Sequence, residues 1–302
     1  MRQRQKLIAV VGPTASGKSE LAVKIARQYN GEIISADSRQ IYRGLDIGTA
    51  KVPGAWKGGV FSYKKIPHYC IDFISPKKTY GVAEYQTCAN TAIRAVAQRG
   101  KIPILVGGTG LWIDAVVYGW HLPHVPPNQK LRAKLEKKTA AQLLAMLKKI
   151  DPKRATTIEQ KNLRRLIRAI EIATALGSVP ALKKYSPYNT LMVGLNPIPA
   201  ILEKRISNRT QKMISCGLIA EIKKLLISRV SKKRIHEFGF EYQAGLDYLE
   251  GTIKNRKDLH ARITRDTRAY ARRQMTWFKR NHTIVWNPTV RDLQKQIGIL
   301  LT

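Results

Sequence analysis

The sequence predicts an α/β protein of the P-loop NTPase-like kind, with a parallel sheet core flanked by helices and with a helical insertion domain. Three observations support this fold class. A phosphate-loop motif stands between a strand pattern and a helix pattern, apolar strand runs then alternate with amphipathic helix runs, and a Lys-rich, proline-bounded stretch interrupts the alternation. We therefore expect residues 1–122 and 189–302 to form the core and residues 123–188 to form the insertion.

The phosphate-loop motif lies in residues 7–21, which read LIAVVGPTASGKSEL. The β-branched run before Gly12 predicts a strand, and the apolar spacing after Ser19 predicts a helix. This is the context that a G-x-x-x-x-G-K-[ST] match requires, and a chance match on an ordinary turn would lack it. The two glycines permit a tight turn whose N–H groups face an anion, and Lys18 adds a positive charge. We expect the loop to hold a diphosphate or triphosphate, with Mg²⁺ bound at the Ser19 hydroxyl.

A second strand is predicted over residues 32–36, and Asp37 follows it. Because the carboxyl ends of parallel strands gather at one edge of a sheet, Asp37 should lie beside the phosphate loop. A carboxylate there can bind Mg²⁺ or accept a proton from a nucleophile. The alternative is that Asp37 only caps the next helix.

After a predicted loop over residues 41–51 and a helix over 85–98, a third strand is expected at 102–106. It ends in Gly-Gly-Thr, where a P-loop protein that hydrolyses ATP usually has an acidic residue. Small residues at a strand end allow another backbone or a ligand to approach closely, and the Thr109 hydroxyl could bind such a ligand.

In the insertion, the sequence predicts a Lys-rich helical stretch over 128–149 and a second helix over 161–176. In the second helix Arg164, Arg165 and Arg168 form one cationic face without interspersed acids. Such a face either contacts phosphate groups or is solvated.

The remaining chain predicts a strand over 190–195 and a long helix from about residue 199, with Arg209 on one side. The aromatic residues of 236–242 form either a base-stacking surface or part of the core. A further helix over 262–280 combines outward arginines, Arg268 and Arg272 among them, with aromatic residues that pack inward. This combination suits RNA binding.

Composition indicates a polyanionic partner. Lys and Arg number 54 against 20 Asp and Glu, so the net charge is +34. A generally basic proteome is the alternative reading of this charge. Three widely spaced cysteines indicate reduced thiols and a cytoplasmic location, and no apolar run is long enough to cross a membrane.

Six blocks, in this order, resemble the tRNA dimethylallyltransferase family over nearly the whole chain. They are GPTASGKS (12–19), SADSRQIYRGLDIGTAK (35–51), ILVGGTGLW (104–112), NLRRLIRAIEI (162–172), RISNRTQKMISCGL (205–218) and TRAYARRQMTWFKR (267–280). The resemblance implies transfer of a dimethylallyl group from dimethylallyl diphosphate to N6 of the adenosine at position 37 of tRNA, just 3′ of the anticodon, with release of diphosphate.

The resemblance also implies residue roles. Asp37, Thr109 and Arg209 would be catalytic, with Asp37 as general base, and Ser19 would bind Mg²⁺. The diphosphate would contact Gly12, Thr14, Ala15, Ser16, Gly17, Lys18 and Ser19. The tRNA would contact Asp37, Ser38, Arg39, Gln40, Thr109, Arg132, Arg164, Arg165, Arg168, Arg268 and Arg272. The insertion would grip the anticodon stem-loop, and the protein would act as a monomer.

Two other functions fit parts of the sequence. A small-molecule P-loop kinase would also place a base such as Asp37 beside the loop, but it gives no reason for the +34 charge. A non-enzymatic RNA-binding factor could retain a relic phosphate loop. Binding of ATP rather than the prenyl donor would indicate the kinase, and an Asp37→Ala variant with unchanged turnover would argue against the base.

Overall fold

The computed structural model describes residues 4–182 and 185–302 and divides the chain into two compact units. The larger unit comprises Met1–Gly119 and Ser186–Thr302, and the smaller comprises Trp120–Tyr185. The smaller unit therefore begins and ends three residues before the predicted insertion. Its two connections to the larger unit lie together, because the Ser186 N–H donates to the Tyr118 carbonyl at 3.3 Å.

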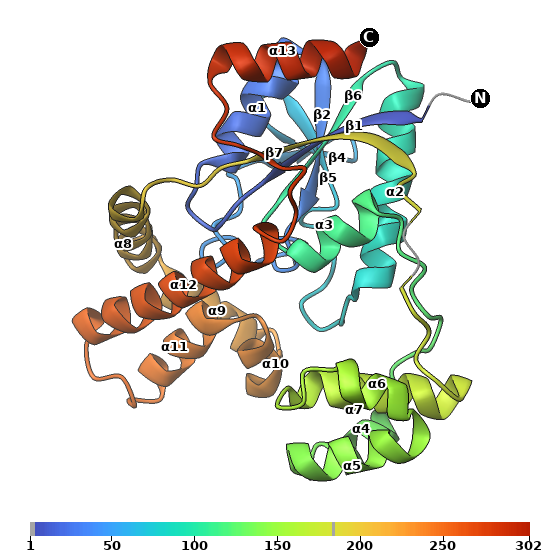
Figure 1. The fold of residues 1–302 in the computed structure, drawn as a ribbon. Coiled ribbons are helices and arrows are strands. Elements are labelled where there is room, and N and C mark those ends of the chain that lie inside the picture. The colour runs from blue at the N-terminus through green and yellow to red at the C-terminus, as the bar shows by residue number, and fades with distance from the viewer. Residues whose placement is uncertain (1–3, 183–184) are drawn as a thin grey trace. The chain divides into compact units, whose positions relative to one another are not determined.

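The larger unit is built on one eight-stranded sheet (Figure 1). Its strands are β1 (Gln5–Val11), β2 (Gly31–Ala36), β3 (Ala55–Lys57), β4 (Val60–Tyr63), β5 (Ile66–Tyr69), β6 (Ile102–Gly107), β7 (Tyr188–Gly194) and β8 (Val285–Trp286). Their order is β3-β4-β5-β2-β6-β1-β7-β8. Every neighbouring pair from β5 to β8 is parallel, whereas β4 is antiparallel to both β3 and β5.

Helices cover both faces of the parallel strands, which explains why the inner parts of β1, β6 and β7 are nearly continuous apolar runs. The covering helices are α1 (Lys18–Gln28), α2 (Val82–Gln98), α3 (Gly110–Val117) and α13 (Val290–Leu301). Alternate residues of β1 point to opposite faces. Ile8 packs in the cluster that contains Ile25 of α1 and Ile297 of α13, whereas Ala9 packs in the cluster that contains Ile93 and Ile113.

A helical layer follows β7 in the chain. It consists of α8 (Pro199–Ser215), α9 (Leu218–Ile227), α10 (Lys232–Glu237), α11 (Phe240–Leu249) and α12 (Arg256–Phe278). The long helix α12 packs against α8, α11 and α3, so it runs from the outer helices to the edge of the sheet (Figure 1). Phe238 and Tyr242 are fully buried here, which favours the core interpretation of the aromatic segment 236–242.

The smaller unit is helical and has its own apolar core. It contains α4 (Gln129–Leu135), α5 (Ala140–Ile150), α6 (Pro152–Thr157) and α7 (Leu163–Leu176). The Lys-rich helical stretch predicted over 128–149 corresponds to two helices, α4 and α5, because the chain breaks between them. Thr139 and Gln142 form a capping box that starts α5 as a separate helix.

Most of the predicted core elements are present. The strands expected at 32–36, 102–106 and 190–195 correspond to β2, β6 and β7, and the helices expected at 85–98 and 161–176 correspond to α2 and α7. Residues 41–51 form turns, as predicted. The short strands β3 to β5 and the helix α13 were not predicted, since short strands leave little periodicity to detect.

The prediction of reduced cysteines is wrong for one pair. Cys70, directly after β5, and Cys88 of α2 form a disulfide, whereas Cys216 is free. The two partners are 18 residues apart, and only the packing of α2 against the sheet brings them together. None of the helices in residues 4–182 and 185–302 has the length and apolar content needed to cross a membrane.

Candidate active site

The loop between β1 and α1 has the backbone of an anion cradle. Gly12 and Gly17 have φ angles of 148° and 96°, and Ala15 also has a positive φ of 62°. A Cβ atom on Gly12 would lie 2.5 Å from the Leu195 carbonyl oxygen, so only glycine fits there. The turn ends at Lys18, where α1 begins and its N-terminal N–H groups face the same space. The predicted role of the two glycines in the turn is confirmed.

The loop lines a cavity of about 430 Å³. Lys18 extends along it, and its Nζ donates to the Pro13 carbonyl oxygen at 3.1 Å. Burial lowers the pKa of Lys18 to about 8, although the nearby Asp37 carboxylate acts in the opposite direction and Arg209 adds to the lowering. A cation whose charge is disfavoured in this way is stabilised when an anion binds beside it. The cavity therefore suits a phosphate group.

Asp37 lies where the sequence predicted, at the end of β2 and in the lining of the same cavity. Its Oδ1 atom accepts hydrogen bonds from the N–H groups of Arg39 at 2.9 Å and Gln40 at 3.4 Å. The alternative of a helix cap is wrong, because residues 38–41 form turns rather than a helix, and Oδ1 caps this turn instead. Among the described residues, Oδ2 accepts no hydrogen bond, so one carboxylate oxygen can cap the turn while the other serves a ligand.

Thr109 brings the end of β6 against the Asp37 loop. Its Oγ1 accepts a hydrogen bond from the Ser38 N–H at 3.2 Å and lies 3.4 Å from the Ser38 Oγ. Gly107, just before it, faces the cavity, and a Cβ there would lie 2.1 Å from the Ala36 carbonyl oxygen. The two strand ends are therefore in direct contact, as their small residues predicted.

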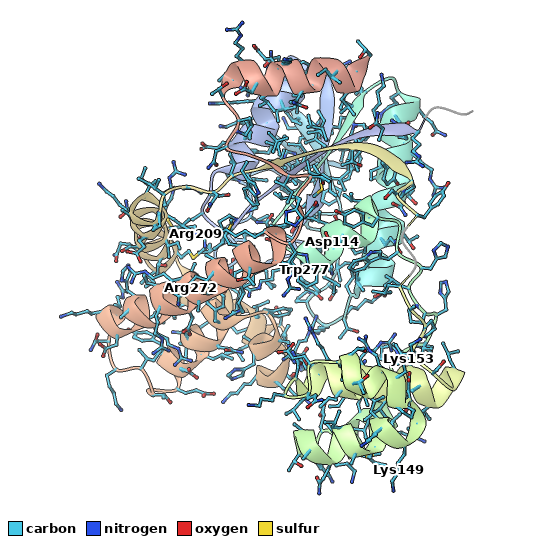
Figure 2. All side chains as sticks on the ribbon, viewed as in Figure 1. Asp114, Lys149, Lys153, Arg209, Arg272 and Trp277 are labelled. Carbon is cyan, nitrogen blue, oxygen red and sulfur yellow. A yellow bond between two sulfur atoms is a disulfide. The ribbon has the colours of Figure 1, made fainter. Side chains whose placement is uncertain are left out.

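Two arginines of α8 reach the cavity from the opposite side. Arg209, labelled in Figure 2, lines it together with Arg205, four residues earlier. The Arg209 Nε has no hydrogen-bond partner among the described residues, and burial lowers its pKa although Glu241 and Asp37 act in the opposite direction. The Arg205 Nη1 donates to the Ser16 carbonyl at 3.1 Å. Both guanidinium groups can therefore add positive charge beside a diphosphate.

Two of the predicted tRNA contacts near Asp37 are held by the protein itself. Arg39 lies 4.9 Å from the Phe240 ring centroid and 5.1 Å from that of Tyr270, and its Nη1 is 2.6 Å from Glu241. The Gln40 amide donates to backbone carbonyls of residues 49 and 50 at 3.2 and 3.3 Å. These side chains shape the loop through contacts within the protein.

The predicted arginines of α12 are on its outer side. Arg272 is exposed (Figure 2), and Arg268 lies 3.7 Å from the exposed carboxylate of Glu203. Tyr270 and Phe278 pack inward, as predicted. Exposed cations on one helix face remain available to a phosphate backbone.

Most of the predicted arginines of the smaller unit pair with acidic side chains that the prediction did not include. Arg132 donates from Nε and Nη2 to the buried Glu171 carboxylate, both at 2.7 Å, and Arg168 lies 3.4 Å from the same carboxylate. Arg165 pairs with Glu159 at 2.9 Å. The expected cationic face without acids is therefore wrong, because the fold brings acids to it from α7 itself and from the preceding loop. Arg164 is the member of the predicted set that has no acidic partner in the described part of the chain.

Arg205, Glu241 and Gln274 contact the site but were not predicted as site residues. Arg205 bonds to Ser16, Glu241 bonds to Arg39, and Gln274 of α12 bonds to the phosphate loop. Gln274 lies four residues after Tyr270 and three before Trp277, so helical spacing on the inward side could have indicated it. No local signal distinguishes Glu241 from a surface acid.

A Mg²⁺ site is compatible with the residues present. Ser19 stands in the first turn of α1 and lines the cavity with Asp37. A hydroxyl and a carboxylate are both oxygen ligands of the kind that Mg²⁺ accepts beside phosphate oxygens. Groups of three or more His, Cys, Asp or Glu side chains that could hold a metal alone are not found in residues 4–182 and 185–302.

Known protein families match almost the entire chain. The family model described as IPP transferase matches residues 40–281, and the model described as isopentenyl transferase matches residues 5–54. A tRNA dimethylallyltransferase of Roseiflexus sp. (strain RS-1) is 42% identical over 305 residues, which cover 98% of this chain and 97% of the relative. One of Carboxydothermus hydrogenoformans is 42% identical over 303 residues, covering 97% of this chain and 95% of the relative.

Solved structures agree with these matches. The full-length tRNA isopentenylpyrophosphate transferase of Bacillus halodurans has a TM-score of 0.69 and 35% identity, covering 99% of this chain and 95% of that protein. A eukaryotic dimethylallyltransferase acting on tRNA has a TM-score of 0.73 and 26% identity, covering 98% of this chain and 78% of that protein. This chain therefore shares its P-loop α/β architecture with both solved proteins.

Proposed function

This chain belongs to the IPP transferase family, and we infer that it is a prenyltransferase that transfers a dimethylallyl group to tRNA. The observation that carries this function is the 42% identity to tRNA dimethylallyltransferases over 97–98% of the chain. The local geometry supports it independently. A phosphate cradle opens beside Asp37, and a P-loop kinase would not account for the charge of +34.

The donor is dimethylallyl diphosphate, and we propose that its diphosphate occupies the cradle over residues 12–19. Lys18, Arg205 and Arg209 face that position with three positive charges. Charge grows on the diphosphate as its bond to the allylic carbon breaks, so fixed cations stabilise the transition state more than the ground state. Mg²⁺ held at Ser19 would neutralise further charge on the leaving group when bound.

The acceptor is proposed to be the N6 amine of the adenosine just 3′ of the anticodon. The amine nitrogen forms a bond to the allylic carbon, the carbon–oxygen bond to diphosphate breaks, and the amine proton passes to Asp37. Oδ2 of Asp37 is the atom available for this proton, since Oδ1 caps the turn. An aromatic amine is a weak nucleophile, and general-base assistance contributes about 10²–10⁴-fold. Thr109 lies at the strand end that would border the base after it leaves the stack.

The tRNA surface is proposed to include the outer arginines of α12 and the free arginine of the smaller unit. Arg268, Arg272 and Arg164 present positive charge without a close buried acid. We expect binding to depend steeply on salt, since each phosphate contact releases counterions. We further propose that the enzyme acts as a monomer in the cytoplasm.

The direct test supplies unmodified tRNA, dimethylallyl diphosphate and Mg²⁺ to the purified protein and analyses the digested tRNA by mass spectrometry. One added five-carbon unit on a single adenosine is the expected product. Replacing the donor with ATP should give no modified nucleoside and only weak binding. Tight ATP binding with phosphorylation of a small acceptor would instead favour the kinase.

A further inference from the structure

The side chain of Gln274 joins two segments of the active site. Gln274 is buried in α12. Its Oε1 atom accepts a hydrogen bond from the Thr14 N–H at 2.8 Å, and its Nε2 donates to the Gly108 carbonyl oxygen at 2.8 Å. Thr14 belongs to the diphosphate loop, and Gly108 directly precedes Thr109. One amide group therefore ties the loop proposed for the donor to the strand end proposed for the acceptor.

The contact leaves little freedom in the choice of side chain. A Cβ atom on Gly108 would lie 2.3 Å from the Gln274 Nε2, so the amide touches the backbone directly. The two bonds require a neutral group that accepts at one atom and donates at the other. A glutamate could accept but not donate, and a methionine of similar volume could do neither. Because the site is buried, each unmet partner costs free energy.

Tyr270, Gln274 and Trp277, which follow one another along α12, each contact a different segment. Tyr270 packs against Arg39 in the loop after Asp37. Trp277 donates from Nε1 to the Asp114 Oδ2 of α3 at 2.9 Å, and the two residues are labelled where α12 meets α3 in Figure 2. Gln274, between them, is the one that bonds to the diphosphate loop.

We propose that Gln274 is a positioning residue for prenyl transfer, which holds the diphosphate loop and the Thr109 strand end at the separation that the displacement requires. This rests on the proposed binding of diphosphate in the loop. The Thr14 N–H points to Gln274 rather than to the anion, so Gln274 acts on the shape of the loop and is not a ligand. The incoming nitrogen, the carbon and the departing oxygen must align, and a misplacement of about 1 Å can cost about 10²-fold in rate.

The test compares two substitutions in the same helix. Gln274→Met keeps the volume and removes both hydrogen bonds, whereas Trp277→Phe removes the bond to α3 and leaves the loop contact. We expect Gln274→Met to lower kcat about 10- to 100-fold at saturating donor and tRNA, with tRNA affinity and folding retained. The two variants should lower the melting temperature by similar small amounts, but Trp277→Phe should change kcat much less than Gln274→Met. A kcat of Gln274→Met close to that of the parent, or an equal loss in both variants, overturns the proposal.

A second measurement uses the unaltered protein and needs no turnover. Hydrogen exchange of the loop amides is followed before and after addition of inorganic diphosphate with Mg²⁺. The Thr14 amide should be protected in both states, whereas the amides of Gly17 and Lys18 should become protected only after the addition. Rapid exchange at Thr14 before the addition overturns the role of Gln274. An absent response at Gly17 and Lys18 would instead contradict the diphosphate site, so the two failures are distinguishable.

Discussion

The Oε2 atom of Glu241 lies 2.6 Å from the Nη1 atom of Arg39, and only 5% and 21% of the two side chains are exposed. Gly239 makes room for the pair, since a Cβ atom there would lie 2.4 Å from the Arg39 Cζ. Burial opposes the charge of Arg39, yet the Glu241 carboxylate raises its pKa. Because Arg39 is two residues after Asp37, this ion pair fixes the loop that carries the proposed base.

Removing one partner of this ion pair should destabilise the protein. Glu241→Ala leaves the Arg39 charge buried beside Arg209, which costs about 3–5 kcal/mol in comparable pairs. The exposed pair of Lys232 and Glu250, in the same helical layer, provides the control, and Glu250→Ala should cost far less. Urea denaturation of both variants measures the difference. Equal costs would show that the buried pair has no special role.

The proton-accepting role of Asp37 can be separated from its capping role. Asp37→Asn keeps an oxygen that accepts from the Arg39 N–H but removes the base. We expect the single-turnover rate to fall by about 10²–10⁴-fold, with the melting temperature and tRNA affinity close to those of the parent. A variant that retains full activity would leave Asp37 with the capping role alone.

The outer arginines of α12 should account for part of the salt dependence of tRNA binding. Changing Arg268 and Arg272 to Gln removes two phosphate contacts, so the slope of log affinity against log salt should become shallower by about 1 to 2. The measurement is a binding titration at several salt concentrations. Arg291→Gln, an exposed change of the same charge on α13, serves as the control and should leave the slope unchanged.

The smaller unit contains one arginine with a structural role, Arg132, and one that is a candidate RNA contact, Arg164. Arg132→Met removes two hydrogen bonds to the buried Glu171 and should destabilise this unit by about 1–3 kcal/mol. The Arg164 side chain contacts no acidic side chain among the described residues. Arg164→Gln should therefore weaken tRNA binding with little effect on stability. Denaturation and tRNA titration of both variants test this division. If Arg132→Met weakens tRNA binding while stability stays intact, the assignment of the two residues must be reversed.

Acid stability should depend on Glu32. Burial would raise its pKa, but hydrogen bonds from Lys101, Tyr69 and Arg99 outweigh burial and lower the pKa below the ordinary value of 4.5. The bonded carboxylate therefore stabilises the fold fully above pH 4.5, and this contribution is lost as the pH falls through the lower folded-state pKa. The stability difference between the parent and Glu32→Gln should shrink on acidification, as measured by denaturation at a series of pH values. A constant difference would mean that Glu32 does not titrate with folding.

Local patterns were sufficient for much of the fold and part of the site. The β-branched run, the two glycines and the Lys-Ser pair specify the phosphate loop within fifteen residues. Strand ends placed Asp37 in the cavity beside this loop and Thr109 against the segment that follows Asp37. Prolines and a change of composition located the insertion to within three residues. These features depend on backbone conformation and on short-range periodicity, which a sequence displays directly.

Only the tertiary structure decided which side chains act on one another. Gln274 contacts Thr14, 260 positions away in the sequence, and Glu241 contacts Arg39, 202 positions away. Neither pairing produces a periodic pattern in the sequence. Packing likewise determined which arginines of the smaller unit are held by Glu171 and which one stays free for a phosphate. A contact between distant positions depends on how whole helices and strands pack, and this information is spread over the entire core rather than held in any one segment.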